Sequence, residues 1–223
     1  WTGTVRARKK SAEVKLATNL VGLSSSLPVP FNKPANEPMN LSFERKPPPE
    51  PAPRAAAKTA VARAPTLGPA QDMLDLTLGR VLRLQLVRRH QNDRASITRG
   101  LLAVGDGNAV LPERNMNVAV NLERADLDFW RGILEARANG ASREASVLPP
   151  LPTVQFDLRA AELVLQEKSF HEVRVTGSRA ENSPSTRFDL KSREVAGDFE
   201  WNNGGGGKLT GRIEQFAIPE ASA

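Results

Sequence analysis

Apolar and polar residues alternate along much of the chain, most regularly over residues 154–160, where Val, Phe, Leu and Ala take every second position. A period of two places successive side chains on opposite faces of a β-strand. The same alternation predicts strands over residues 2–9, 12–20, 39–45, 97–104, 116–122, 163–166, 172–178, 187–191, 195–201 and 208–216.

A run of alternating leucines predicts a strand pair or a bend. Leu74, Leu76 and Leu78 precede Gly79, and the alternation resumes over residues 82–86. Glycine allows a tight turn, so this segment forms either a hairpin or one long kinked strand.

Glycine and asparagine mark other breaks between short strands, at residues 105–108 and 202–207. Short strands separated by such turns are typical of antiparallel hairpins. The predicted fold is therefore mainly β, an elongated antiparallel meander with one short amphipathic helix. A parallel α/β architecture is not expected.

One segment is predicted to form a helix. Asp126 or Asp128 precedes an apolar stripe that begins at Trp130 and recurs three and four residues later. An acidic cap followed by a one-sided stripe indicates a helix over about residues 128–138, with Trp130 on its buried side. Capping explains the two aspartates better than a glycosidase-like carboxylate pair.

Residues 46–70 interrupt the strand pattern with proline and alanine, a composition that cannot pair in a sheet or bury a core. We interpret this segment as a flexible excursion. The predicted organisation is N-terminal strands at 1–45, the excursion at 46–70, hairpins plus the helix at 71–140, and C-terminal strands at 153–223.

The residues that carry most catalytic chemistry are scarce. The chain has no cysteine, and its two histidines, His90 and His171, lie far apart without a nucleophile pattern, so both are expected at the surface. The glycine run before Lys208 lacks the Ser or Thr that a phosphate-binding loop needs. We therefore expect no enzyme, no metal site and no cofactor.

The net charge of +6 could suggest a polyanionic partner. Because the basic residues are scattered among acidic ones and lack interleaved aromatics, a solvated basic face is the better interpretation, and no nucleic-acid partner is expected. No run approaches the ~18 apolar residues that cross a bilayer. The chain opens on Trp1 and is expected to be a piece of a longer protein whose membrane anchor lies elsewhere.

Several motifs follow one another in a fixed order. They are residues 22–35 (GLSSSLPVPFNKPA), 99–105 (RGLLAVG), 111–113 (LPE), 125–130 (ADLDFW), 156–163 (FDLRAAEL) and 197–201 (GDFEW). Together they resemble the central region of the YhdP proteins, members of the wider AsmA-like and TamB-like group. The segment at 46–70 departs from the family pattern without disturbing the order.

The resemblance implies a long periplasmic protein, anchored in the inner membrane, whose strands form an open, taco-like trough. Proteins of this kind are linked to moving phospholipid between the inner and outer membranes of Gram-negative bacteria. The implied partners are phospholipid acyl chains, the remaining strands of the full-length protein and other envelope proteins.

Period-two spacing selects candidate residues for the apolar lining of such a groove. They are Phe156, Leu158, Val173, Val175, Phe199 and Trp201. The same alternation suits a β-sandwich, whose apolar faces cover each other. The alternative hypothesis is therefore a non-enzymatic β-sandwich module that binds protein or polysaccharide.

Overall fold

The structure, a computed structural model, describes residues 1–8, 11–47, 71–91, 94–105, 109–140, 151–204, 207–218 and 220–221. The strands are β1 (Thr2–Arg8), β2 (Ser11–Thr18), β3 (Leu41–Lys46), β4 (Gln71–Leu78), β5 (Leu82–Gln91), β6 (Arg94–Gly105), β7 (Asn115–Asp126), β8 (Val154–Leu165), β9 (Lys168–Arg179), β10 (Ser185–Lys191), β11 (Val195–Asn202), β12 (Lys208–Phe216) and β13 (Glu220–Ala221). One helix, α1 (Leu127–Gly140), follows β7.

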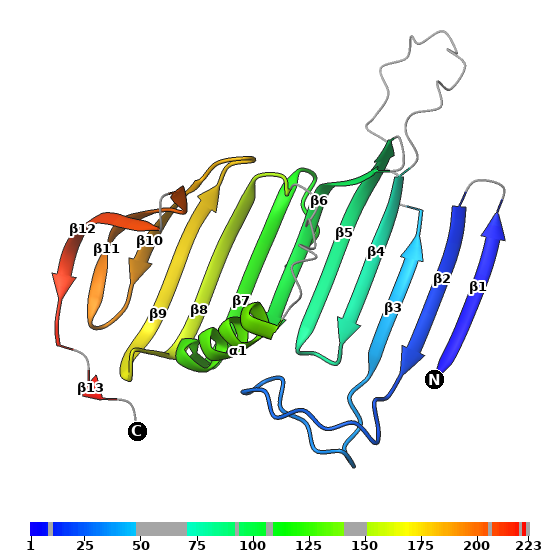
Figure 1. Cartoon of the computed structure of the whole chain (residues 1–223), viewed down its shortest axis with the longest axis horizontal. Helices are drawn as coiled ribbons and strands as arrows, with labels where there is room; N and C mark the ends of the chain where they lie inside the picture. Colours follow the sequence, from blue (N-terminus) through cyan, green and yellow to red (C-terminus); the bar gives the residue numbers. More distant parts are fainter. Residues whose placement is uncertain are drawn as a thin grey trace, which may run out of the picture.

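All described strands belong to one open sheet (Figure 1). β1 to β12 lie side by side in chain order, and the short β13 pairs with β9. The prediction of a mainly β, elongated and open fold with one short helix is confirmed. The sheet is curved, so its two faces differ in shape as well as in chemistry.

The antiparallel order has one interruption that the sequence did not predict. β6, β7 and β8 run in the same direction, giving two parallel pairs in the middle of the sheet. Each parallel pair requires the chain to return to the starting end of the sheet before the next strand, and α1 follows β7 within the second of these connections. Residues 141–150 lie outside the described part of the chain.

Most predicted strands are present. The leucine run forms a hairpin of β4 and β5, with Gly79 at φ 52° in the turn. The two predicted strands at 154–160 and 163–166 are one continuous strand, β8. The predicted excursion begins as β3 ends at Lys46, and its residues 48–70 lie outside the described part of the chain.

The two aspartates at the start of α1 make different hydrogen bonds. Asp126 caps the helix, because its Oδ1 accepts a hydrogen bond from the Phe129 amide at 2.8 Å. The Asp128 carboxylate instead accepts the amides of Gln166 and Glu167, both at 2.9 Å. Asp128 thus ties the first turn of α1 to the turn between β8 and β9.

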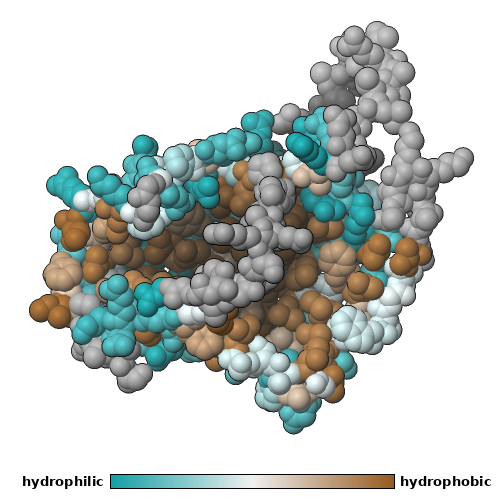
Figure 2. Space-filling view, in the orientation of Figure 1, coloured by the Kyte–Doolittle hydropathy of each residue, from teal (hydrophilic) through white to brown (hydrophobic). Residues whose placement is uncertain are grey.

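The two faces of the sheet differ in polarity. Leu74, Leu76 and Leu78 of β4 point to one face, and Asp75 and Thr77 point to the other. We call the first the apolar face and the second the back face. Figure 2 shows apolar residues filling the middle of the front of the molecule, the side on which α1 crosses β7 and β8 in Figure 1.

The most deeply buried side chains lie on the back face. Val87 and Leu101 are 1% and 0% exposed. Arg99, which pairs with Val87, donates from Nη1 to the Pro112 carbonyl at 3.2 Å. Pro112, in the described stretch that leads into β7, therefore lies against the back face of β6.

Candidate apolar groove

One row of paired residues crosses the apolar face from β1 to β12. Each member is opposite the next in the strand register, so all of them point the same way. The row consists of Gly3, Leu16, Phe43, Leu76, Leu84, Leu102, Val118, Phe156, Gly177, Phe188, Phe199 and Gly211. Because it contains no polar side chain, we call it the central apolar row.

A second row runs beside the first. It consists of Leu41, Leu78, Leu82, Val104, Val120, Leu158, Val175, Leu190, Gly197 and Ile213. At about 4.8 Å between strands, the twelve-strand row is roughly 50 Å long. The face is thus a long apolar strip that runs across the strands.

The apolar strip is only half covered. The leucines, valines and phenylalanines of both rows between β3 and β11 are half-buried, and Leu16 is 40% exposed. The described strands all belong to one sheet, so among them no second sheet packs on this face. This differs from the β-sandwich of the alternative hypothesis, in which facing sheets fill the core.

The end of the strip from β8 to β12 is aromatic. Phe188 and Phe199 stack with ring centroids 5.5 Å apart and an interplanar angle of 23°. A Cβ on Gly177 would lie 2.7 Å from Phe156 Cζ, and one on Gly211 would lie 2.4 Å from Phe199 Cδ1. The rings therefore lie over glycines, which leaves a smooth aromatic floor.

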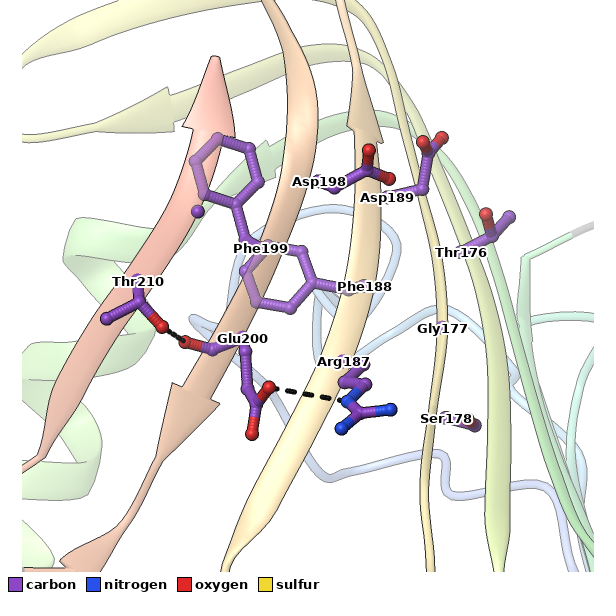
Figure 3. A pocket seen from close by; sticks show the side chains of 11 residues that line it. Thr176, Gly177, Ser178, Arg187, Phe188, Asp189, Asp198, Phe199, Glu200 and Thr210 are labelled. Carbon is purple, nitrogen blue, oxygen red and sulfur yellow. Dashed lines mark hydrogen bonds and ion pairs between the residues drawn. The ribbon is translucent and has the colours of Figure 1, made fainter.

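An open pocket of about 560 Å³ lies at this end of the sheet. It is lined by residues 176–178, 187–189, 198–200 and 210–211 of β9 to β12. Figure 3 shows Phe188 and Phe199 side by side within it, while Arg187 turns toward Glu200, whose Oε2 lies 3.3 Å from Arg187 Nε. The pocket combines an aromatic wall with a charged edge.

The six groove candidates all belong to the apolar face, at different depths. Phe156 and Phe199 lie in the central apolar row, and Leu158 and Val175 are paired in the second. Val173 is only 5% exposed and is buried rather than lining the open surface. Trp201 is 39% exposed, and its indole lies against Gly207.

Two segments distant in sequence meet at the lower edge of the strip in Figure 1. Phe31, in the connection between β2 and β3, contacts Trp130 of α1 edge to face. Lys33 organises this connection from within: it is 6% exposed, and its Nζ donates to the carbonyls of Leu23 and Pro34 at 2.7 and 2.9 Å. Trp130 is half-buried through this contact, so the helix side predicted to be buried packs on a loop.

The upper edge of the strip in Figure 1, where β3 and β5 end and β4 begins, carries charge. Arg45 Nε donates to Asp72 Oδ2 at 2.7 Å, Arg88 donates to both Asp72 oxygens at 2.9 and 2.8 Å, and His90 Nε2 lies 3.1 Å from Asp72 Oδ1. Burial of Asp72 opposes its ionisation. The hydrogen bonds from Arg88, together with the nearby His90 ring, outweigh burial and hold the pKa of Asp72 at about 2, below its ordinary value of 3.8.

The family model of the YhdP protein matches residues 1–223, the full length of the chain. The chain belongs to the YhdP family. The predicted resemblance is therefore confirmed, and membership of this family suggests an AsmA-like envelope protein associated with lipid transport. No curated protein and no solved structure matches this chain.

The charged cluster at the upper edge of this YhdP-family sheet was not predicted, although the sequence carries a signal for it. Arg45 follows Leu41 and Phe43 in the same period-two phase, and Asp72 precedes Leu74 in the phase of the β4 leucines. Charged residues in the apolar phase of a strand point onto the apolar face. Their phase could have identified the cluster, but their pairing needed the strand register.

The two histidines, predicted to lie at the surface, have side chains that are 34% and 33% exposed, and each lies beside a carboxylate. His90 takes part in the Asp72 cluster, and His171 Nδ1 lies 2.8 Å from Glu194 Oε1. Glu194 also accepts the His171 amide at 2.8 Å. Burial of Glu194 opposes ionisation, but the hydrogen bonds from His171 hold its pKa below the ordinary value. This pair joins β9 to the turn between β10 and β11.

The described residues carry neither a metal-binding cluster nor a membrane-spanning helix. Within them, no group of three or more His, Asp or Glu side chains is placed to hold a metal ion. Among the same residues, no helix has the length and apolar character that crossing a bilayer requires.

Proposed function

We propose that the apolar face of this YhdP-family chain is a groove for phospholipid acyl chains, and that the chain is a periplasmic segment of an inner-membrane-anchored protein that carries phospholipid between the inner and outer membranes. The central apolar row, unbroken across twelve strands and half exposed, is the observation that supports this function most directly. Family membership supports the same assignment.

The dimensions and chemistry of the strip suit hydrocarbon. One leaflet of a bilayer core is about 15 Å thick, so a strip of roughly 50 Å accommodates extended acyl chains lengthwise. Transfer of each methylene from water to an apolar surface contributes about 0.8 kcal/mol. A row without polar side chains allows chains to shift along the groove, because no position holds a fixed polar partner.

The proposed function is non-enzymatic. Hydrocarbon chains require an apolar surface rather than a nucleophile or a metal, and the apolar rows provide this surface. The carboxylates that the sequence analysis weighed as catalytic candidates, Asp126 and Asp128, instead hold a helix cap and a turn.

A charge placed in the row tests this function. Leu102→Glu puts a carboxylate in the central apolar row, and Gln155→Glu puts the same group at an exposed position on the back face of β8. We expect lipid extracted from purified full-length protein to fall several-fold for Leu102→Glu and to stay at the parent level for Gln155→Glu. Equal lipid content in all three proteins would contradict a groove on the apolar face.

A further inference from the structure

Arg45 lies among apolar residues of one row at the upper edge of the strip. Arg45 lies opposite Val14 on one side and Leu74 on the other, and Leu74 lies opposite Leu86. All four side chains therefore point to the apolar face. A charged residue in this position needs a physical reason, because its neighbours in this part of the row are hydrocarbon side chains.

Asp72 supplies part of that reason by drawing two guanidinium groups together. Arg45 Nε and Arg88 Nη2 both donate to Asp72 Oδ2, at 2.7 and 2.8 Å. The Asp72 side chain is 9% exposed, whereas the side chains of Arg45 and Arg88 are 38% and 24% exposed. The carboxylate thus lies below, and the two arginines are its solvent-facing cover.

The two guanidinium groups retain donors that Asp72 does not use. A guanidinium carries five N–H donors. Arg45 donates to Asp72 from Nε alone, and Arg88 donates from Nε and Nη2. Among the residues that the structure describes, Asp72 is the only acceptor of side-chain hydrogen bonds from either arginine.

The charges of the cluster do not cancel. Two arginines face one carboxylate whose pKa of about 2 keeps it ionised at neutral pH, so the cluster has an excess of positive charge before His90 is counted. Unused donors on converging guanidinium groups match the oxygens of a phosphate, which arginine binds in a bidentate manner. The ligand class indicated is a phosphate-bearing group.

The position of the cluster favours a phosphate that is joined to hydrocarbon. Leu74 and Leu86 lie next to Arg45 in the same row, so a ligand held by the arginines has the apolar strip beside it. A glycerophospholipid has this construction, with its phosphate a few bonds from its acyl chains. A free phosphate would use the arginines without the leucines.

We propose that Arg45 and Arg88, held by Asp72, bind the phosphate of a phospholipid head group at the upper edge of the groove while the acyl chains lie on the apolar rows. This inference rests on the proposed function, because it places the tails in the groove. It adds a fixed head-group position to a surface that otherwise recognises hydrocarbon alone.

The test compares three probes that separate phosphate from tails: dioleoyl phosphatidylglycerol, dioleoylglycerol with the same acyl chains, and glycerol 3-phosphate. Removing the arginines alone would leave Asp72 as an unpaired buried charge and could unfold the protein. The test variant is therefore Arg45→Gln/Asp72→Asn/Arg88→Gln, which neutralises the whole cluster. The matched control is Arg83→Gln, on the exposed back side of β5.

Equilibrium binding of each probe is measured with full-length protein whose urea midpoint shows that it is folded. We expect the triple variant to bind phosphatidylglycerol about tenfold more weakly, the size of a lost charge-assisted hydrogen bond, and dioleoylglycerol as the parent does. The Arg83→Gln protein should bind both lipids like the parent.

Other outcomes overturn the assignment in distinguishable ways. Unchanged binding of phosphatidylglycerol, or an equal loss for both lipids, would remove the head-group site and leave the acyl-chain groove standing. Glycerol 3-phosphate that binds the parent as tightly as the phospholipid would identify a free-anion site instead. A parent protein that binds neither lipid would remove the proposed function and the head-group site with it.

Discussion

Phe31 and Trp130 meet edge to face, with ring centroids 5.8 Å apart and ring planes at 87°. Phe31 lies between β2 and β3, and Trp130 lies in α1 after β7, so β4, β5 and β6 separate their strands in the sheet. The contact holds the β2–β3 connection against α1 at the lower end of the apolar strip.

The aromatic contact predicts energetic coupling between the loop and the helix. Edge-to-face aromatic pairs contribute about 0.5 to 1.5 kcal/mol beyond the area they bury. In a double-mutant cycle of Phe31→Ala and Trp130→Ala, the free energies of urea unfolding should deviate from additivity by that amount. Additive losses would mean that the two rings stabilise the fold independently.

The glycines beneath the aromatic rings give a second prediction. A Cβ on Gly177 would lie 2.3 Å from the Arg187 carbonyl oxygen and 2.7 Å from the Phe156 ring. Gly177→Ala should therefore destabilise the protein by about 1 to 3 kcal/mol through overpacking. Gly132, in α1, has nothing within 4 Å of the same atom, so Gly132→Ala should stabilise by up to about 1 kcal/mol. Melting temperatures of the two variants that shift in the same direction from the parent would contradict this.

The Asp72 cluster predicts a loss of stability in acid. The folded pKa of Asp72, about 2, lies below the ordinary 3.8, so ionised Asp72 stabilises the fold above pH 4 and this contribution is lost as pH falls toward 2. The parent should lose more unfolding free energy than Asp72→Asn across that window. Parallel pH profiles for the two proteins, measured by urea unfolding, would show that the cluster does not hold the Asp72 pKa low.

The turn between β8 and β9 predicts a stabilising substitution. Gln166 and Glu167 have φ of 52° and 58°, a region that side chains disfavour and glycine adopts freely. Glu167→Gly should stabilise the fold by about 1 kcal/mol. Asp128 accepts hydrogen bonds from both turn amides, and these bonds hold its pKa below the ordinary value. Asp128→Asn should therefore destabilise the fold. A Glu167→Gly protein that melts below the parent would refute the assigned strain.

Much of the fold follows from alternation, because alternation depends only on neighbours in the sequence. It located the strands from β1 to β12, and it limited the segment around Gly79 to a hairpin or a kinked strand, of which the structure has the hairpin. It could not reveal the parallel pairs at β6, β7 and β8, because strand direction depends on where a connection runs. Only nine residues, 106–114, separate β6 from β7 in the sequence, and so short a separation ordinarily indicates a hairpin.

The candidate groove could also be predicted only in part from the sequence. Phe156, Leu158, Val175 and Phe199 were assigned to one face from spacing alone, and the register places them in the two rows. The extent of the rows across twelve strands depends on register, which no local pattern encodes. The glycines that seat the phenylalanine rings are opposite them in neighbouring strands, so their role also needed the structure.

Site-specific photo-crosslinking tests the central claim most directly. A photoreactive residue at Phe156 or Val175 lies on the apolar face, and one at Gln155 or Arg174 lies on the back face of the same two strands. In cells that make the full-length protein, we predict phospholipid adducts at the first two positions and none at the second two. Equal labelling at all four positions, or at none, would contradict an acyl-chain groove on this sheet.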